Sequence, residues 1–167
     1  YSYDAKGRLT QTIDPKGTTS YQYDPLDRIT KKIDKLGGIT SYTYDQSGNL
    51  VSITDPERRT TNYEYDSLNR LTSTIDPTGA RTSYTYDQTG NISTITDNLG
   101  NRTTYTYDSL NRLISTTDQL GNRTTYTYDP NGNIISSTDP LNRTTTYTYD
   151  SNNRLITIRY PLYAINY

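Results

Sequence analysis

The sequence predicts an all-β fold, in which tandem 21-residue β-hairpin repeats form one continuous, antiparallel and twisted sheet. Three observations predict it. A Tyr-x-Tyr-Asp motif recurs along the chain, turn-forming sequences separate short segments rich in Tyr, Thr and Ile, and no segment has helical periodicity.

The Tyr-x-Tyr-Asp motif sets the period of the chain. It occurs eight times, once at a spacing of 20 residues and then at six spacings of 21. We therefore expect a single array that fills all 167 residues without a linker. The expected repeats are 1–20, 21–41, 42–62, 63–83, 84–104, 105–125, 126–146 and a degenerate last repeat, 147–167. The first Tyr of each repeat is called position 1 below.

Each repeat contains two expected turns, called here the first turn (positions 4–8) and the second turn (positions 14–18). In both, Asp is followed three residues later by Gly or Asn in most repeats, and often directly by Pro. This order is typical of a type I turn, and Gly or Asn tolerates the left-handed backbone that leads into a bulge. The expected turn aspartates are Asp4, Asp14, Asp24, Asp34, Asp45, Asp55, Asp66, Asp76, Asp87, Asp97, Asp108, Asp118, Asp129, Asp139 and Asp150.

The segments between the turns have the length of ordinary strands, as in 102–107 and 112–117. In the first kind, the tyrosines at positions 1 and 3 share one face, and Thr faces solvent on the other. In the second kind, positions 9 and 13 are expected to share a face, as in Ile29 and Ile33. The tyrosines expected to pack on the sheet include Tyr63, Tyr65, Tyr84, Tyr86, Tyr105, Tyr107, Tyr126 and Tyr128.

Two architectures fit this pattern. In a meander, each strand pairs with the strands before and after it in the chain. In a β-solenoid, each repeat forms one coil with two strands. Tight turns return the chain about 4.8 Å away, whereas a coil must cross about 10 Å between sheets, so the turns favour the meander.

The composition excludes several kinds of site. The chain has 19 Tyr but no Cys, His, Met, Trp or Phe, and its net charge is −1. Disulfides, Cys/His metal sites and Ser–His or Cys–His nucleophiles are therefore absent, and we expect no cofactor and no enzymatic activity. The low charge gives no attraction for nucleic acid, and no apolar run reaches the ~18 residues that a membrane span needs. Because the chain lacks Met, we expect it to be a fragment of a longer protein.

The acidic residues are interpreted as structural, since fifteen of the 18 lie in the repeated turns. Catalysis by two carboxylates requires two different environments, and calcium binding is a minor alternative. The arginines at position 8 are expected to form an Arg–Asp ladder between neighbouring repeats instead of a nucleic-acid site; they are Arg8, Arg28, Arg70, Arg112 and Arg154. Asn-x-Ser/Thr sequences make candidate glycosylation sites of Asn91, Asn101, Asn122 and Asn142.

The combined motif resembles the YD repeat of the Rhs family. The resemblance rests on Tyr-x-Tyr-Asp, x-x-Gly-Arg/Asn-Leu and Asp-Pro-x-Gly-x-x-Thr at a 21-residue period, and it covers all eight repeats. Members include bacterial Rhs toxins, wall-associated proteins, Tc toxin shell subunits and teneurins. The resemblance implies a strip of antiparallel strands that spirals into a hollow shell, which encloses a C-terminal effector in the toxins.

The chain departs from that family in two ways. It has no match to the Pro-x-x-x-x-Asp-Pro-x-Gly-Leu motif that ends such shells, so no autoproteolytic Asp is assigned. The last repeat has Tyr160 at position 14 and an apolar tail, 160–167, which is either a degenerate junction or a cap for self-association.

The sequence therefore predicts a non-enzymatic structural array of a large secreted or cell-surface protein. One hypothesis is a segment of the wall of an Rhs-type toxin shell. The alternative is an extracellular fibre or adhesin shaft, and a weaker one is carbohydrate binding by the tyrosine face. The expected partners are further repeats of the same chain or identical chains, an enclosed effector domain, or cell-surface glycans.

Overall fold

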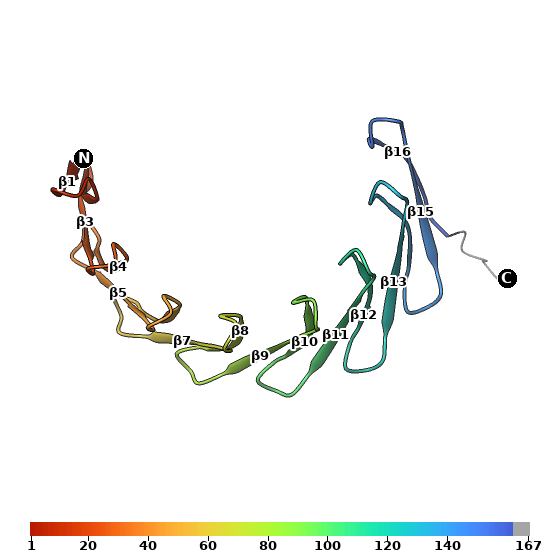
Figure 1. Ribbon diagram of the computed structural model, residues 1–167, viewed down its shortest axis with the longest axis horizontal. Coiled ribbons are helices and arrows are strands. Elements are labelled where there is room, and N and C mark those ends of the chain that lie inside the picture. The colour runs from red at the N-terminus through yellow and green to blue at the C-terminus, as the bar shows by residue number, and fades with distance from the viewer. Residues whose placement is uncertain (162–167) are drawn as a thin grey trace. The chain divides into compact units, whose positions relative to one another are not determined.

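The computed structural model describes residues 1–161, which form sixteen β-strands and no helix (Figure 1). The chain divides into two compact halves, Tyr1–Thr82 and Ser83–Tyr167. The strands of the first half are β1 Ser2–Tyr3, β2 Leu9–Asp14, β3 Gly17–Tyr23, β4 Ile29–Ile33, β5 Ile39–Tyr44, β6 Leu50–Thr54, β7 Thr60–Tyr65 and β8 Leu71–Ile75. The boundary falls within β9 Arg81–Tyr86, which is followed by β10 Ile92–Thr96, β11 Arg102–Tyr107, β12 Leu113–Thr117, β13 Arg123–Tyr128, β14 Ile134–Thr138, β15 Thr144–Tyr149 and β16 Leu155–Arg159.

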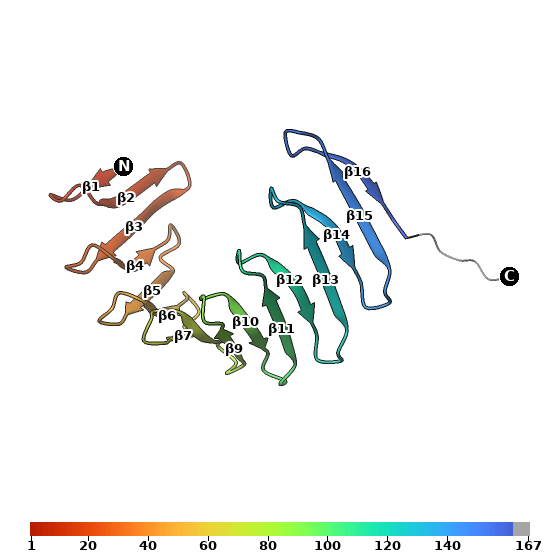
Figure 2. The same cartoon turned by 45° about the vertical axis from the view of Figure 1, so that its right-hand side comes forward.

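The strand order in the sheet is the order of the chain, β1 to β8 in the first half and β9 to β16 in the second. Within each half, the strands pair antiparallel with their neighbours in sequence, as β13 does with β12 and β14 (Figure 2). The antiparallel meander is therefore confirmed, and the two-strand coil of a solenoid is excluded. Strands that carry Tyr at positions 1 and 3 alternate with strands that carry Leu or Ile at position 9.

Most hairpins use a three-residue loop with one left-handed residue at its end. In the turn at Asp108, the N–H of Asn111 donates to the Asp108 carbonyl at 3.0 Å, and the Asp108 N–H donates to the Arg112 carbonyl at 2.9 Å. Asn111 has a φ of 60°. This is a type I turn followed by a left-handed residue, the geometry of three-residue hairpins.

The second turn of the first repeat is shorter than the others. Asp14 pairs directly with Gly17, which leaves a two-residue loop. Gly17 has a φ of 135°. The single 20-residue spacing in the sequence therefore comes from the shorter loop, and the flanking strands β2 and β3 have 6 and 7 residues.

A β-bulge in each even strand separates positions 9 and 13 onto opposite faces. Ile29 lies opposite Tyr23, whereas Ile33 lies opposite Ser20, and the register shifts between Gln22 and Tyr23. Because residues directly opposite one another share a face, Ile29 is on the tyrosine face and Ile33 is on the other. The expectation that positions 9 and 13 share a face was therefore wrong. The bulge adds one residue to the even strand. The residues beyond it therefore point to the opposite face from the one expected.

The sheet has no apolar core within the described residues. Among residues 1–161, no apolar side chain is buried, and the buried residues are Ser73, Thr94 and Ser115. These three occupy position 11 on the threonine face, where Arg81 Nη1 donates to Ser73 Oγ at 3.0 Å and Arg102 Nη2 donates to Thr94 Oγ1 at 3.2 Å. Stability must therefore come from strand pairing, half-buried tyrosines and side-chain hydrogen bonds, and not from a closed interior.

Candidate functional site

Each turn aspartate holds its own loop in place. In the first turn of repeat 6, Asp108 Oδ1 accepts the N–H groups of Leu110 at 2.9 Å and Arg112 at 3.0 Å, and Oδ2 accepts Arg112 Nε at 2.7 Å. The backbone N–H of Arg112, followed by its guanidinium, lowers the pKa of Asp108. The carboxylate is ionised and fully engaged, which suits a structural group and not a proton donor.

The same arrangement recurs at fourteen of the fifteen expected turn aspartates. Each accepts the N–H of the residue four positions on; they are Asp4, Asp24, Asp34, Asp45, Asp55, Asp66, Asp76, Asp87, Asp97, Asp108, Asp118, Asp129, Asp139 and Asp150. Asp14 lies at the short loop and accepts the N–H of Lys16 at 2.7 Å instead. Among residues 1–161, no three acidic residues gather in a way that could hold a metal ion.

The hydroxyl of the position-3 tyrosine joins its repeat to the one before it at six places within the two halves. Tyr128 Oη donates to the carbonyl of Leu113 at 2.6 Å, and Leu113 is the residue at position 9 beside the bulge. The bulge frees a backbone carbonyl from the strand ladder, and the phenol satisfies it. The same bond joins Tyr23 to Leu9, Tyr44 to Ile29, Tyr65 to Leu50, Tyr107 to Ile92 and Tyr149 to Ile134.

The tyrosines that the sequence assigns to sheet packing all lie half-buried on one face; they are Tyr63, Tyr65, Tyr84, Tyr86, Tyr105, Tyr107, Tyr126 and Tyr128. Those at position 1 lie opposite position 12 of the following strand, as Tyr126 does opposite Ser137. Burial raises the pKa of the Tyr107 and Tyr128 phenols. Half-burial leaves less of each ring free for a ligand.

The arginines at position 8 act mainly inside their own turn, which corrects the ladder expected between repeats. Arg28 pairs with Asp24 and Arg112 with Asp108, both at 2.7 Å and four residues apart. Toward the next repeat, Arg112 Nη1 donates to the backbone carbonyl of Asp129 at 3.1 Å. Its guanidinium also lies 4.7 Å from the centre of the Tyr128 ring.

Arg8 does form the expected ion pair with a carboxylate of the next repeat, at 2.6 Å from Asp27. The preference of the other arginines for their own turn has a geometric cause. The turn carboxylate is four residues away on the same loop, while the next repeat turns its aspartate carboxylate toward its own loop and presents a carbonyl.

The asparagines at position 8 reach across repeats in a different way. Asn91 Nδ2 donates to Asp87 Oδ2 at 3.1 Å within its turn and to Asn111 Oδ1 at 2.8 Å in the next repeat. Asn49 donates to Asn69 at 2.8 Å, and Asn133 to Asn153 at 2.9 Å. The sequence displayed the signal for these bonds, because Arg and Asn alternate at position 8, but the pairing with position 7 was missed.

The four candidate glycosylation sites differ in how far their amides are engaged. Asn91 is bonded as above, Asn101 Nδ2 donates to Asp97 Oδ2 at 2.7 Å, and Asn122 Nδ2 donates to Asp118 Oδ2 at 2.8 Å. Asn142 is exposed and left-handed, with a φ of 59°, and no hydrogen bond of its side chain is found within residues 1–161. Asn142 is therefore the most accessible of the four.

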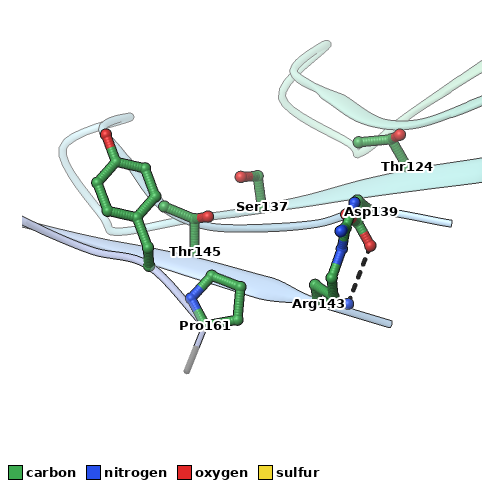
Figure 3. Close-up of a pocket in the computed structure, with 7 residues that line it drawn as sticks. Thr124, Ser137, Asp139, Arg143, Thr145 and Pro161 are labelled. Carbon is green, nitrogen blue, oxygen red and sulfur yellow. Dashed lines mark hydrogen bonds and ion pairs between the residues drawn. The ribbon is translucent and has the colours of Figure 1, made fainter. Parts of the chain in front are cut away.

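A hollow of about 230 Å³ lies at the second turn of repeat 7 (Figure 3). Its lining residues are Thr124, Ser137, Asp139, Arg143, Thr145, Tyr160 and Pro161. Figure 3 shows Arg143 directed at Asp139, and Arg143 Nε donates to Asp139 Oδ2 at 2.6 Å. Among these lining residues, the one carboxylate is therefore paired already, and the remaining polar groups are hydroxyls.

A second hollow of about 390 Å³ lies between neighbouring first turns and is lined by Asp87, Gln88, Thr89, Tyr107, Asp108 and Ser109. Its two carboxylates each accept backbone N–H groups of their own loops. The described residues also contain no helix that could cross a membrane. Most of the expected cap or junction, residues 162–167, lies outside the described residues.

A family model described as RHS Repeat matches the chain in seven overlapping stretches: 3–39, 23–60, 44–81, 65–102, 86–118, 107–140 and 128–165. No curated protein matches the sequence significantly.

The chain is similar to solved structures of Tc toxins. One is the crystal structure of TcdB2-TccC3, with 20% identity and a TM-score of 0.75 over 91% of this chain. The same complex without its hypervariable C-terminal region gives 24% identity and a TM-score of 0.74 over 93%. The Photorhabdus luminescens Tc holotoxin pore, a TccC3 mutant, gives 20% identity and a TM-score of 0.73 over 87%.

This chain spans only 9% to 10% of the length of those solved chains, so the likeness concerns the fold of a segment. The repeat matches extend from residue 3 to residue 165, and the bulged hairpins recur along both halves. The chain therefore belongs to the RHS-repeat family.

Proposed function

We propose that this chain is a structural, non-enzymatic segment of the β-sheet wall of an Rhs-type shell, which encloses an effector in a secreted or cell-surface protein. The observation that carries the proposal is the bond that joins six of the position-3 tyrosines to the repeat before them. It joins repeats along the array without a closed core, which is what a wall of any length requires.

The chemistry of the turns supports the structural role. Most acidic residues are turn aspartates. Their carboxylates accept hydrogen bonds from backbone N–H groups, and many also from Arg or Asn side chains of their own loops. General acid–base catalysis needs a carboxyl group with a raised pKa and free access to substrate. The pKa of Asp129, held down first by the side-chain amide of Asn133, has moved in the opposite direction.

Exposed leucines at the turn tips support further repeats or identical chains as partners. Leu99, Leu120 and Leu141 occupy the second turns of three consecutive repeats and are 79%, 79% and 69% exposed. A row of exposed leucines at one end of the strands suits contact with further repeats or with an identical chain.

Electron microscopy of the full-length protein that contains this segment tests the proposal. Closed hollow particles that protect an enclosed C-terminal region from added protease are expected. Long uniform filaments would overturn the shell and favour the second candidate, an extracellular fibre or adhesin shaft. That candidate draws support from the near-identity of repeats 5 to 7, where LGNRTTYTYD occurs at 99–108 and again at 120–129.

Carbohydrate binding by the tyrosine face is the weaker alternative. Sugar rings stack on open aromatic faces, and the rings of Tyr105, Tyr107, Tyr126 and Tyr128 are half-buried instead of open. Binding of the full-length protein to a glycan array, lost on substitution of these tyrosines by Leu, would restore this reading.

A further inference from the structure

The first turns alternate between two forms, while the second turns do not. From repeat 3 onward, positions 7 and 8 read Gly-Asn and Asn-Arg in turn: 48–49, 69–70, 90–91, 111–112, 132–133 and 153–154. In the second turns, positions 17 and 18 read Gly-Asn in both repeat 5 and repeat 6. The alternation is therefore confined to the first turns, which points to a cause in the contacts that the first turns make.

When a Gly-Asn turn precedes an Asn-Arg turn, two amides join them. Asn91 Nδ2 donates to Asn111 Oδ1 at 2.8 Å, and Asn133 Nδ2 donates to Asn153 Oδ1 at 2.9 Å. The short side chain at position 8 requires an acceptor that projects from position 7 of the next repeat. Asn supplies this acceptor and also tolerates the left-handed backbone there, since Asn111 has a φ of 60°.

When an Asn-Arg turn precedes a Gly-Asn turn, the longer guanidinium needs no such acceptor. Arg112 donates to the Asp129 carbonyl at 3.1 Å and lies over the Tyr128 ring, both of which every repeat presents. Position 7 is then free to be Gly132, whose φ of +90° is cheapest for glycine. A Cβ there would meet nothing within 4 Å, so steric exclusion is not the reason for glycine.

The second turns and the first repeats agree with this explanation. In the second turns, Asn101 and Asn122 donate to Asp97 and Asp118 of their own loops, and the sequence there does not alternate. Where the alternation is broken, Arg8 faces an acidic Asp27 at position 7 of the next repeat, at 2.6 Å. From repeat 2 onward, position 7 is thus Asn wherever the repeat before it has Asn at position 8, and Gly or Asp wherever that repeat has Arg.

We propose that position 8 of one repeat and position 7 of the next form a neighbour-recognition surface with two forms. The partner that each form fits is a repeat of the opposite form. The structural period along the first-turn edge of this chain is therefore a pair of repeats, 42 residues, and not 21.

A double-mutant cycle between repeats 5 and 6 tests this inference. Asn91→Arg and Asn111→Gly each remove the hydrogen bond that joins Asn91 to Asn111. The double variant recreates the Arg–Gly form seen between repeats 6 and 7. Amide hydrogen exchange of β11 and β12 reports the local opening equilibrium. The coupling should favour the double variant by roughly threefold to tenfold in that equilibrium.

A matched control separates recognition from backbone strain. Asn153 has a φ of 59°, like Asn111, but does not contact Asn91, so Asn91→Arg with Asn153→Gly should show no coupling. Equal coupling in both cycles, or none between Asn91 and Asn111, would overturn the inference. Asn111→Gly and Asn153→Gly each replace an asparagine in the left-handed conformation. The stability gained from that change of backbone cancels within each cycle.

Discussion

At the scale of the residue, a single tyrosine side chain provides the contacts that a buried side chain provides in a globular domain. Tyr128 fills the tyrosine face with its ring and ends on the carbonyl of Leu113 in the preceding repeat. The guanidinium of Arg112 covers the other side of the ring. Packing, a hydrogen bond and a cation–π contact therefore converge on one side chain, and the loss of the hydroxyl alone should be measurable.

We expect Tyr128→Phe to lower the free energy of unfolding by about 1–2 kcal/mol, because the half-buried carbonyl of Leu113 loses its donor. Tyr126→Phe is the matched control, since it removes a phenol from the same strand and face for which no hydrogen bond is found. Urea denaturation of the two variants measures the difference. Equal losses would contradict a special role for position 3.

The ionisation of these groups sets the pH range over which the array is stable. The backbone N–H of Arg112 holds the pKa of Asp108 below its ordinary value, so the unfolded state binds its proton first as the pH falls. The stabilising contribution is present above the unfolded pKa of about 3.9 and is lost as the pH falls through the lower folded pKa. Because most turn aspartates share this arrangement, we expect a steep loss of stability below about pH 4.

The alkaline limit has the opposite sign. Burial raises the pKa of Tyr128, so its contribution is present below the unfolded pKa of about 10 and is lost as the pH rises through the folded value. Thermal unfolding followed by circular dichroism from pH 2 to pH 12 checks both limits. High salt serves as a control, since local hydrogen bonds from backbone N–H groups should leave the acid transition in place. An acid limb that vanishes in salt would contradict this cause.

At the scale of the element, the hairpin loop is the unit that the sequence specifies most strongly. The residue at the end of the loop must be left-handed, and Gly or Asn occupies that place in most turns. Arg58 is an exception, with a φ of 64° in the second turn of repeat 3. A long side chain in this conformation carries a backbone cost that Gly does not.

We therefore expect Arg58→Gly to raise the free energy of unfolding by about 1 kcal/mol. The reverse substitution at the same repeat position, Gly79→Arg, should lower it by a similar amount, because Gly79 has a φ of +87° and open space around it. Chemical denaturation of both variants measures the pair. Changes of the same sign would show that side-chain contacts, and not the backbone, decide this position.

At the scale of the whole molecule, stability should be a sum over repeats and their junctions. No apolar side chain in residues 1–161 is buried, so no single region is needed by all the others. The two halves, Tyr1–Thr82 and Ser83–Tyr167, are each compact through contacts of their own. Removal of repeats should shorten the array without abolishing folding.

Deletion of 105–146 joins repeat 5 to repeat 8 and keeps a matched first-turn pair, because Asn91 then faces Asn153. We expect this variant to fold, with a urea m-value reduced roughly in proportion to the lost surface. Deletion of 105–125 alone places Asn91 opposite Gly132 and should destabilise more for each residue removed. Collapse of the 42-residue deletion to an unfolded chain would contradict a sum over repeats.

The sequence was sufficient for the fold because its strongest signals are local. Asp at the start of a turn and Gly or Asn at its end specify a hairpin from four residues, and the repetition carries the result along the chain. The sequence predicted a bulge directly after the turn, but not the one inside the even strand, whose extra residue at position 10 has no distinctive type. Ile33 was therefore placed on the wrong face.

The contacts between repeats were also beyond the sequence. The Tyr128 phenol donates to the backbone carbonyl of Leu113. Every residue has such a carbonyl, so the type of residue at position 113 does not indicate the bond. The preference of Arg112 for Asp108 over a neighbouring carboxylate depends on loop geometry. What the sequence did display, without its meaning being evident, was the alternation of Arg and Asn.

The two-residue loop between Asp14 and Gly17 has a consequence for protein engineering. Although it is shorter than the other second turns, Gln11 still lies opposite Ser20, as Ser115 lies opposite Thr125 across a longer loop. The strand pairing is therefore the same across the shorter loop as across the longer one. Peptides grafted into second turns should be displayed in a row, two strands or about 9.6 Å apart, on a scaffold whose pairing is left intact.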